Sequence, residues 1–219
     1  MRSGAQRQIK VVVPAASDAL TDDRFRRLVP RADWDALPAD VRRRFSKRLS
    51  GTAVVSYSGE IVWTRLSGIG WLLAQLCRLI GAPLPTNDSG PMPAAVMVSE
   101  DRGSSGQCWT RLYGRTRDHP QVIHSAKSFA GPTGLEEHIG GGFGMALTVR
   151  AEADALIFAS DHYFWQHRRL RFRLPRWFAP GATTVMHQHL GSGRFAFDVK
   201  VTHPMFGELL NQHGLFRDA

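Results

Sequence analysis

Acidic residues and histidines lie close together at two points in the sequence and could carry acid–base chemistry. Asp161 directly precedes His162, and Asp198 lies five residues before His203. A carboxylate and an imidazole that share a pocket can act as general acid and base. On one regular strand Asp198 and His203 point to opposite faces, so their side chains are not expected to meet. His203, His162 and Asp161 are therefore candidate catalytic residues of an isomerase or dehydratase, and whether the chain is an enzyme stays open.

Two further groupings could bind a metal ion or a phosphate. His187 and His189 share one face of a strand, but a metal site needs a third and usually a fourth ligand. Surface or hydrogen-bonded histidines are the alternative. The segment 136–138 (Glu-Glu-His) precedes the glycine-rich run 140–144, which lacks the Lys-Ser/Thr of a phosphate-binding loop. That run is expected to form a hairpin entry or a bulge. The sequence predicts neither a metal nor a cofactor.

Arginines and aromatic residues cluster between positions 165 and 178 and could hold an anionic group. Guanidinium groups pair with phosphate or carboxylate, and such a cluster suits a lipid headgroup or a membrane interface. A solvated face of an edge strand is the alternative, and nucleic acid ranks below lipid because no recognised nucleic-acid module is present. The candidate ligand-binding residues are Arg171, Arg173, Arg176, Trp177, Phe195 and Phe197.

The whole chain is basic, since its 219 residues carry a net charge of +9 with 24 Arg and 4 Lys. This favours anionic partners, although Arg-rich coding composition is the alternative explanation. The hydrophobic content of 43% excludes disorder. Cys77 and Cys108 fit neither a zinc site nor a CxxC redox motif. The first residues do not have the pattern of a secretory signal, and no apolar stretch reaches about 18 residues. A cytoplasmic location is expected.

The chain is expected to divide into an arm and a single domain. Residues 1–20 form the flexible N-terminal arm and residues 21–219 the domain. Within the domain, residues 21–50 have helical spacing of apolar residues, and residues 51–219 form a β-rich body.

Three helices are expected. Two lie on either side of Pro30, which breaks helical structure. The second carries Arg42, Arg43 and Arg44 on its polar face, which is either solvated or in peripheral contact with an anionic membrane. The third, at 69–80, is apolar on nearly all sides and would be buried, plug an open barrel end, or touch a membrane.

Alternation of apolar and polar residues predicts about ten antiparallel strands. Ser58 and Gly59 are expected to form the turn of the first hairpin. Because no helices separate the later strands, they should curl into a strongly curved antiparallel sheet or a partly open β-barrel, giving an α+β fold. The expected strands are 52–57, 60–64, 94–100, 107–113, 121–128, 142–150, 155–164, 167–174, 183–190, 194–203 and 208–216.

One strand shows what the interior of such a barrel contains. Phe195, Phe197, Val199 and Val201 share one face with His203. Such faces either pack solid or leave a cavity for an apolar ligand, which would need about 300 Å³ or more.

Several short motifs along the chain form a recognisable set. They are 176–180 (RWFAP), 193–199 (GRFAFDV), His203, Pro204, Gly207, Phe25, Leu28, Trp34, Leu37 and Pro38. This set resembles a family of bacterial domains of unknown function, domain of unknown function 4166. The likeness covers about residues 22–217 and departs at 211–213 (Asn-Gln-His), where an aromatic residue is expected in relatives. It implies a domain that occurs alone or behind a saccharopine-dehydrogenase-like domain, and it implies no catalytic residue.

Three functions fit these observations. The first is a binding protein for an apolar or amphipathic anionic, lipid-like ligand, with the tail in a barrel pocket and the headgroup on Arg171, Arg173 or Arg176. The second is an enzyme that uses the His and Asp candidates in the same pocket. The third is a structural or interaction module for a redox enzyme, which would have a solid core and an exposed apolar patch.

Overall fold

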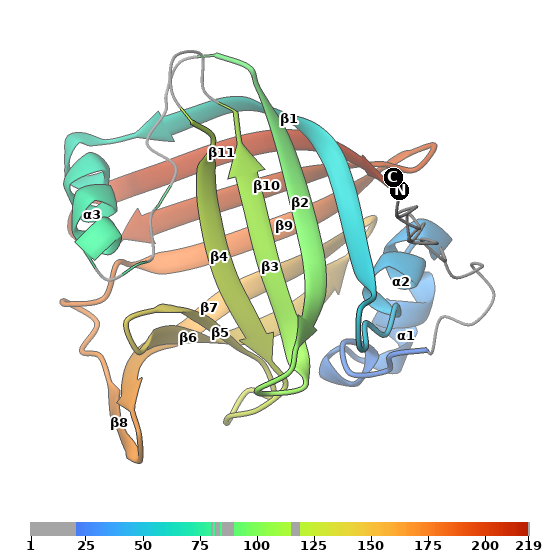
Figure 1. The fold of residues 1–219 in the computed structure, drawn as a ribbon, viewed down its shortest axis with the longest axis horizontal. Coiled ribbons are helices and arrows are strands. Elements are labelled where there is room, and N and C mark those ends of the chain that lie inside the picture. Colours follow the sequence, from blue (N-terminus) through green and yellow to red (C-terminus); the bar gives the residue numbers. More distant parts are fainter. Residues whose placement is uncertain (1–20, 80, 82–83, 85–89, 115–118, 219) are drawn as a thin grey trace, which may run out of the picture.

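The computed structural model describes residues 21–79, 81, 84, 90–114 and 119–218, so the expected arm 1–20 lies outside the described residues. Within them, eleven strands form one sheet in the order β6-β5-β4-β3-β2-β1-β11-β10-β9-β7-β8 (Figure 1). Strand β6 also pairs with β7, which closes ten strands into an antiparallel barrel and leaves β8 outside it. The predicted α+β fold with a barrel is confirmed, and the barrel is closed.

The strands are β1 (Val54–Leu66), β2 (Met92–Asp101), β3 (Gly106–Tyr113), β4 (Gln121–Ser128), β5 (Glu136–Gly140), β6 (Phe143–Glu152), β7 (Ala155–His167), β8 (Leu170–Arg173), β9 (Ala182–Gly191), β10 (Arg194–His203) and β11 (Gly207–Asp218).

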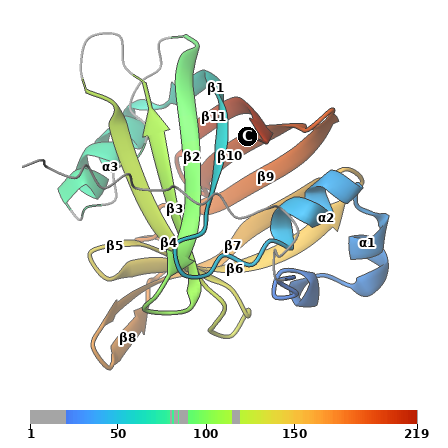
Figure 2. The ribbon, with the colours of Figure 1, turned by 45° about the vertical axis from the view of Figure 1, so that its right-hand side comes forward.

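Helices cover the two ends of the barrel. The 3₁₀ turn η1 (Arg26–Leu28), α1 (Arg31–Ala36) and α2 (Ala39–Phe45) lie at one end, and α3 (Gly68–Leu79) lies at the other (Figures 1 and 2). Both α1 and α2 begin directly after a proline, whose carbonyl accepts the first helical hydrogen bond and whose missing N–H is not needed there. The helix expected before Pro30 is only the 3₁₀ turn η1, which has no side-chain cap and is followed by the extended residue Val29.

The hairpin expected at Ser58 and Gly59 is wrong, because β1 runs through both residues as one continuous strand. Gly59 is needed there for space. A Cβ at this position would lie 2.0 Å from the carbonyl oxygen of Leu215 on β11. A glycine inside a strand therefore marks a close approach of two backbones here and not a turn.

The strands after β4 differ from expectation in two places. Residues 136–140 form strand β5, which was not expected, while the hairpin expected in the run 140–144 is present, with Gly141 and Gly142 in the turn to β6. The single strand expected at 167–174 is a hairpin, in which β7 continues to His167 and β8 returns after a turn at Arg168, whose φ is 53°. Because β8 lies outside the closed barrel, its apolar side chains are exposed and do not line the interior.

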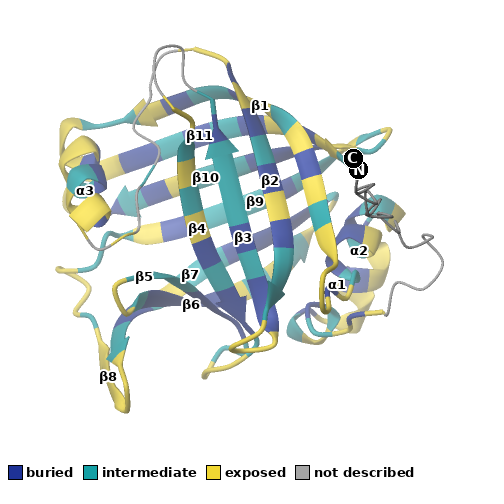
Figure 3. Ribbon diagram, viewed as in Figure 1, coloured by how far each residue is buried: buried dark blue, intermediate teal, exposed yellow. Residues whose placement is uncertain are grey.

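Aromatic side chains fill the half of the barrel next to α2. Phe45 packs edge-on against His187, with ring centroids 5.2 Å apart, and also contacts Phe158. Figure 3 shows buried and exposed residues alternating along the strands, as expected when one face points inward. The remaining interior space therefore lies toward α3.

Candidate functional site

The barrel interior contains a cavity of about 140 Å³ beneath α3. This volume is less than half of that expected for a drug-sized ligand, because the aromatic residues near α2 occupy the rest of the interior. An apolar cavity of about 150 Å³ can hold one benzene molecule, so this one encloses about six carbon atoms. Its apolar lining includes Leu73 and Cys77 of α3 together with Ile139, Met145, Val185, Phe197, Val199 and Val201.

Three charged side chains from neighbouring strands meet inside the barrel. They are Arg111 of β3, Lys127 of β4 and Glu137 of β5, and we call them the interior triad. The Lys127 Nζ atom lies 2.9 Å from Glu137 Oε2, and Arg111 Nη2 lies 3.6 Å from Glu137 Oε1. Arg111 Nη1 also donates to Ser125 Oγ at 3.0 Å. Arg111, Ser125 and Glu137 all line the cavity.

Alternation along the strands explains why these polar residues point inward. Trp109, Arg111 and Tyr113 occupy alternate positions of β3, and Lys127 lies directly opposite Glu137 in the pairing of β4 with β5. Each of the three strands thus contributes one charge to an otherwise apolar face.

The interior triad holds two cations against one anion. Burial raises the pKa of Glu137, but the neighbouring Lys127 and Arg111 charges outweigh this and hold the pKa at about 2. Burial lowers the pKa of Lys127, and the nearby Glu137 opposes that change. The triad thus places two basic side chains on one carboxylate beside the cavity.

Neutral polar groups complete the lining. The hydroxyl groups of Tyr163 and Thr183 share a hydrogen bond of 2.5 Å, and burial raises the pKa of Tyr163 to about 12. Gln212 donates to Thr64 Oγ1 at 2.9 Å. These groups have partners, so they add polarity to the wall without an additional charge.

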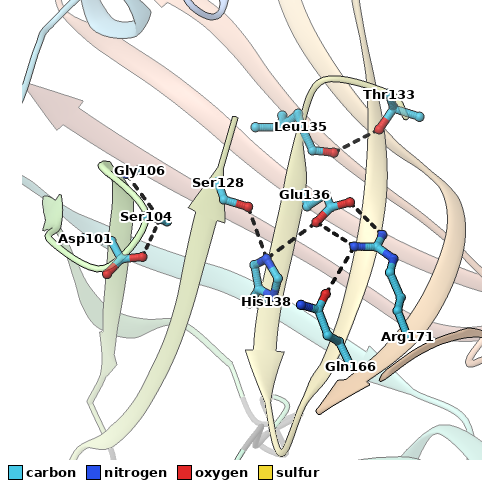
Figure 4. A network of polar contacts seen from close by, with 10 residues as sticks. All are labelled: Asp101, Ser104, Gly106, Ser128, Thr133, Leu135, Glu136, His138, Gln166 and Arg171. Carbon is cyan, nitrogen blue, oxygen red and sulfur yellow. Dashed lines mark hydrogen bonds and ion pairs between the residues drawn. The ribbon is translucent and has the colours of Figure 1, made fainter. Parts of the chain in front are cut away.

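The predicted ligand-binding residues are divided between the interior and the outer surface. Phe197 lines the cavity, and Phe195 is buried nearby, stacked against His187 with ring centroids 5.9 Å apart. Arg171 lies outside the barrel wall, where its guanidinium makes a bidentate contact of 2.6 and 3.1 Å with Glu136 (Figure 4). The same group lies 3.7 Å above the ring of Phe164. Arg171 thus already has a carboxylate partner.

The other residues of this cluster lie on the surface. Arg173, Arg176 and Trp177 are exposed, and an Arg173 nitrogen lies 4.0 Å from Asp161. They lie outside the lining of the cavity. The structure therefore does not bring this arginine cluster together with Phe195 and Phe197.

The candidate catalytic residues lie outside the cavity lining as well. His162 Nδ1 contacts the adjacent Asp161 carboxylate at 2.6 Å, and this hydrogen bond lowers the pKa of Asp161. His203 is buried, and its Nδ1 accepts a hydrogen bond from the backbone N–H of Met205. Asp198 pairs instead with His213, directly opposite on β11.

The arginines of α2 do not form one exposed face. Arg44 is buried, lies 3.8 Å above the ring of Phe195 and contacts Asp218 at 3.3 Å. Arg43 pairs with Asp40 at 2.6 Å. Of the three, Arg44 faces the barrel and is not positioned to meet an external anionic surface.

Among the described residues, no group of three or more His, Cys, Asp or Glu side chains is placed to hold a metal ion. His187 of the sequence-predicted pair is buried among aromatic rings, and this burial lowers its pKa well below the usual value. Of the helices that the structure describes, none combines the length and apolar character that a membrane-spanning helix requires.

The domain is thus a closed ten-stranded antiparallel β-barrel whose interior contains a charged cluster beside a mostly apolar cavity. A family model described as "Domain of unknown function (DUF4166)" matches residues 37–216, which is most of the chain. The chain belongs to this family. No curated protein matches the chain.

Sequence reasoning missed the interior triad. The signal for Arg111 and Lys127 was present, since each shares a predicted strand face with apolar or aromatic residues. The signal for Glu137 was absent, because the five residues of β5 show no clear alternation and no strand was expected there. Without β5, the two inward bases had no visible partner.

Proposed function

We propose that this protein binds a small amphipathic ligand, with its apolar body in the barrel cavity and its anionic group on Arg111. The observation that carries the proposal is a pair of basic side chains, Arg111 and Lys127, that share the single carboxylate of Glu137 at the wall of a mostly apolar cavity. A buried charge without a counter-charge is unfavourable, and a ligand carboxylate or phosphate would supply one. Arg111 therefore takes the role that the sequence alone suggested for Arg171, Arg173 or Arg176.

The cavity size restricts the ligand. About six carbon atoms fit inside, and the exposed side chain of His124 also lines the cavity, which indicates that it reaches the surface. A longer, lipid-like chain would extend outward past α3. The proposed ligand class is an alkyl or terpenoid anion that is enclosed at its charged end.

A matched pair of probes tests this proposal. Isothermal titration calorimetry should show that hexanoate binds more tightly than hexanol. Arg111→Met should weaken hexanoate binding about 10- to 100-fold, because a hydrogen bond to a charged group contributes about 1.5–3 kcal/mol. Hexanol binding should stay unchanged.

Arg173→Met is the control, since it removes an exposed arginine outside the cavity. Equal loss of hexanoate binding in both variants, or equal affinity of the wild type for hexanoate and hexanol, would count against the proposal. Native mass spectrometry followed by solvent extraction would identify the natural ligand as an added mass.

The enzyme alternative has less support. The His and Asp candidates lie outside the cavity lining, and the cavity carboxylate Glu137 is held ionised, so it is a poor proton donor at neutral pH. From the motif resemblance we further infer a bacterial protein whose relatives include fusions behind saccharopine-dehydrogenase-like domains, and from the free thiols of Cys77 and Cys108 we infer a cytoplasmic location. A role as a module for a redox enzyme follows from that resemblance alone.

A further inference from the structure

Helix α3 presents an apolar face to solvent although it is firmly seated on the barrel. Its inner side is buried, and a Cβ at Gly70 would lie 1.9 Å from the carbonyl oxygen of Leu209. The Ser67 hydroxyl accepts a hydrogen bond from the Gly70 N–H and so caps the helix. Ile69, Trp71, Leu72, Leu76 and Leu79 are nevertheless exposed (Figure 3). The close seating at Gly70 fixes which side of α3 faces outward.

Two neighbouring segments extend this apolar surface. The turn between β10 and β11 exposes Met205 and Phe206, and the connection from β8 to β9 exposes Trp177 and Phe178. Both segments lie at the α3 end. His203 at the end of β10 stacks on Phe206 with ring centroids 4.7 Å apart.

Close backbone contact holds the segment between β8 and β9 at the α3 end of the barrel. A Cβ at Gly181 would lie 2.5 Å from the carbonyl oxygen of Thr202, and Pro180 lines the cavity together with Leu73 of α3. We call the exposed set the apolar rim: Ile69, Trp71, Leu72, Leu76, Leu79, Trp177, Phe178, Met205 and Phe206.

Basic residues lie in the same segments as the apolar rim. Residues 65–79 and 168–181 contain seven arginines and no Asp or Glu, and beside Met205 and Phe206 the carboxylate of Glu208 is paired with Lys200 at 3.2 Å. Exposed Trp, Phe and Leu beside arginine are the composition of a surface that enters the headgroup region of an anionic bilayer. The excess of positive charge in these segments calls for an occupant with negative charge, which an anionic lipid surface supplies.

The opposite end of the barrel is also basic but lacks the apolar component. Trp34, Val41 and Phe45 of α1 and α2 are buried. Arg44 is buried and Arg43 pairs with Asp40 at 2.6 Å, whereas Arg173 and Arg176 near the apolar rim are exposed and Arg173 lies 4.0 Å from Asp161. Membrane binding that needs both apolar insertion and positive charge is therefore available at the α3 end.

We propose that the apolar rim docks on the surface of an anionic lipid bilayer, with the outer face of α3 in the headgroup region and the neighbouring arginines on lipid phosphates. This places the α3 end of the cavity against the membrane. The docking stands on the surface alone and does not require a ligand in the cavity.

Vesicle flotation tests the docking with phosphatidylcholine alone and with phosphatidylcholine mixed with phosphatidylglycerol. The wild type should bind the mixed vesicles and bind neutral ones more weakly. Leu72→Glu with Leu76→Glu should reduce binding at least about tenfold, because two apolar side chains no longer insert. Arg173→Glu with Arg176→Glu should reduce binding to the mixed vesicles about tenfold or more and leave binding to neutral ones unchanged.

Two controls separate this docking from general charge and exposure effects. Val54→Glu introduces the same charge at the far end of the barrel, where Val54 is 58% exposed against 54% for Leu72, and should not change binding. Arg42→Glu with Arg43→Glu removes charge from α2 and should have little effect. A loss of binding in this α2 variant, with none in the rim variant, would overturn the proposal.

A second readout does not depend on the stability of the glutamate variants. Brominated lipids should quench the fluorescence of the wild type, and Trp71→Phe should remove much of that quenching. No binding of the wild type to mixed vesicles would overturn the proposal. So would a dimer in analytical ultracentrifugation that Leu72→Glu disrupts, because the rim would then be an interface between two copies.

Discussion

Glu137→Gln removes the only anion of the interior triad and should destabilise the protein strongly. Lys127 and Arg111 would remain buried, 2.9 and 3.6 Å from a neutral side chain. Breaking a buried ion pair by removing one partner costs about 3–5 kcal/mol. Lys127→Met leaves Arg111 and Glu137, which carry opposite charges, so its cost should be only about 1–2 kcal/mol.

Urea unfolding at neutral pH measures this difference. We expect a lower midpoint for both variants with unchanged slopes, and a larger loss for Glu137→Gln. The double variant with Lys127→Met should recover part of that loss, since one of the two unpaired cations is gone. Equal losses in the two single variants, or a loss below about 0.5 kcal/mol for Glu137→Gln, would refute the charge imbalance on which the proposed anion site depends.

Three further predictions concern stability. First, the pKa of Glu137 is about 2 in the folded protein and 4.5 ordinarily, so ionisation of Glu137 stabilises the fold above pH 4.5 and this stabilisation is lost as the pH falls toward 2. The free energy of unfolding, measured as a function of pH, should fall by about 3 kcal/mol over this range in the wild type and show no such fall in Glu137→Gln. Gly59→Ala should destabilise by about 3 kcal/mol or more in thermal unfolding, because its Cβ would meet a backbone oxygen of β11; Gly103→Ala, at an exposed turn, should be nearly neutral, and similar losses would contradict the crowding. Asp218→Asn should cost about 3 kcal/mol in urea unfolding, because the Arg44 side chain, 1% exposed, loses its carboxylate partner; a neutral result would show that Arg44 is satisfied by the Phe195 ring.

The sequence predicted those elements whose pattern is regular over many residues. The alternation from Phe195 to Val201 identified β10 and its inward face, and the apolar run at 69–80 identified α3. Their periodicities are set by backbone geometry, so they can be read without knowing the neighbours. The position of α3 at a barrel end was only one of three alternatives, since an apolar helix can equally be buried or touch a membrane.

Contacts between distant strands could not be predicted in this way. Gly59 has the appearance of a turn residue, and only the backbone of β11, more than 150 residues later, explains it. The charge pair of Lys127 and Glu137 requires the register of β4 with the short strand β5. The arginine cluster near Trp177 was the more conspicuous signal in the sequence, yet it lies outside the barrel because β8 is not part of the closed sheet.

A crystal structure with 6-bromohexanoate, whose bromine gives an anomalous signal, tests the proposed anion site most directly. We predict a bromine peak near Leu73 and Cys77 beneath α3 and carboxylate density within hydrogen-bonding distance of Arg111. A peak on the outer surface beside Arg173 and Arg176, with an empty interior, would rule out the proposed site.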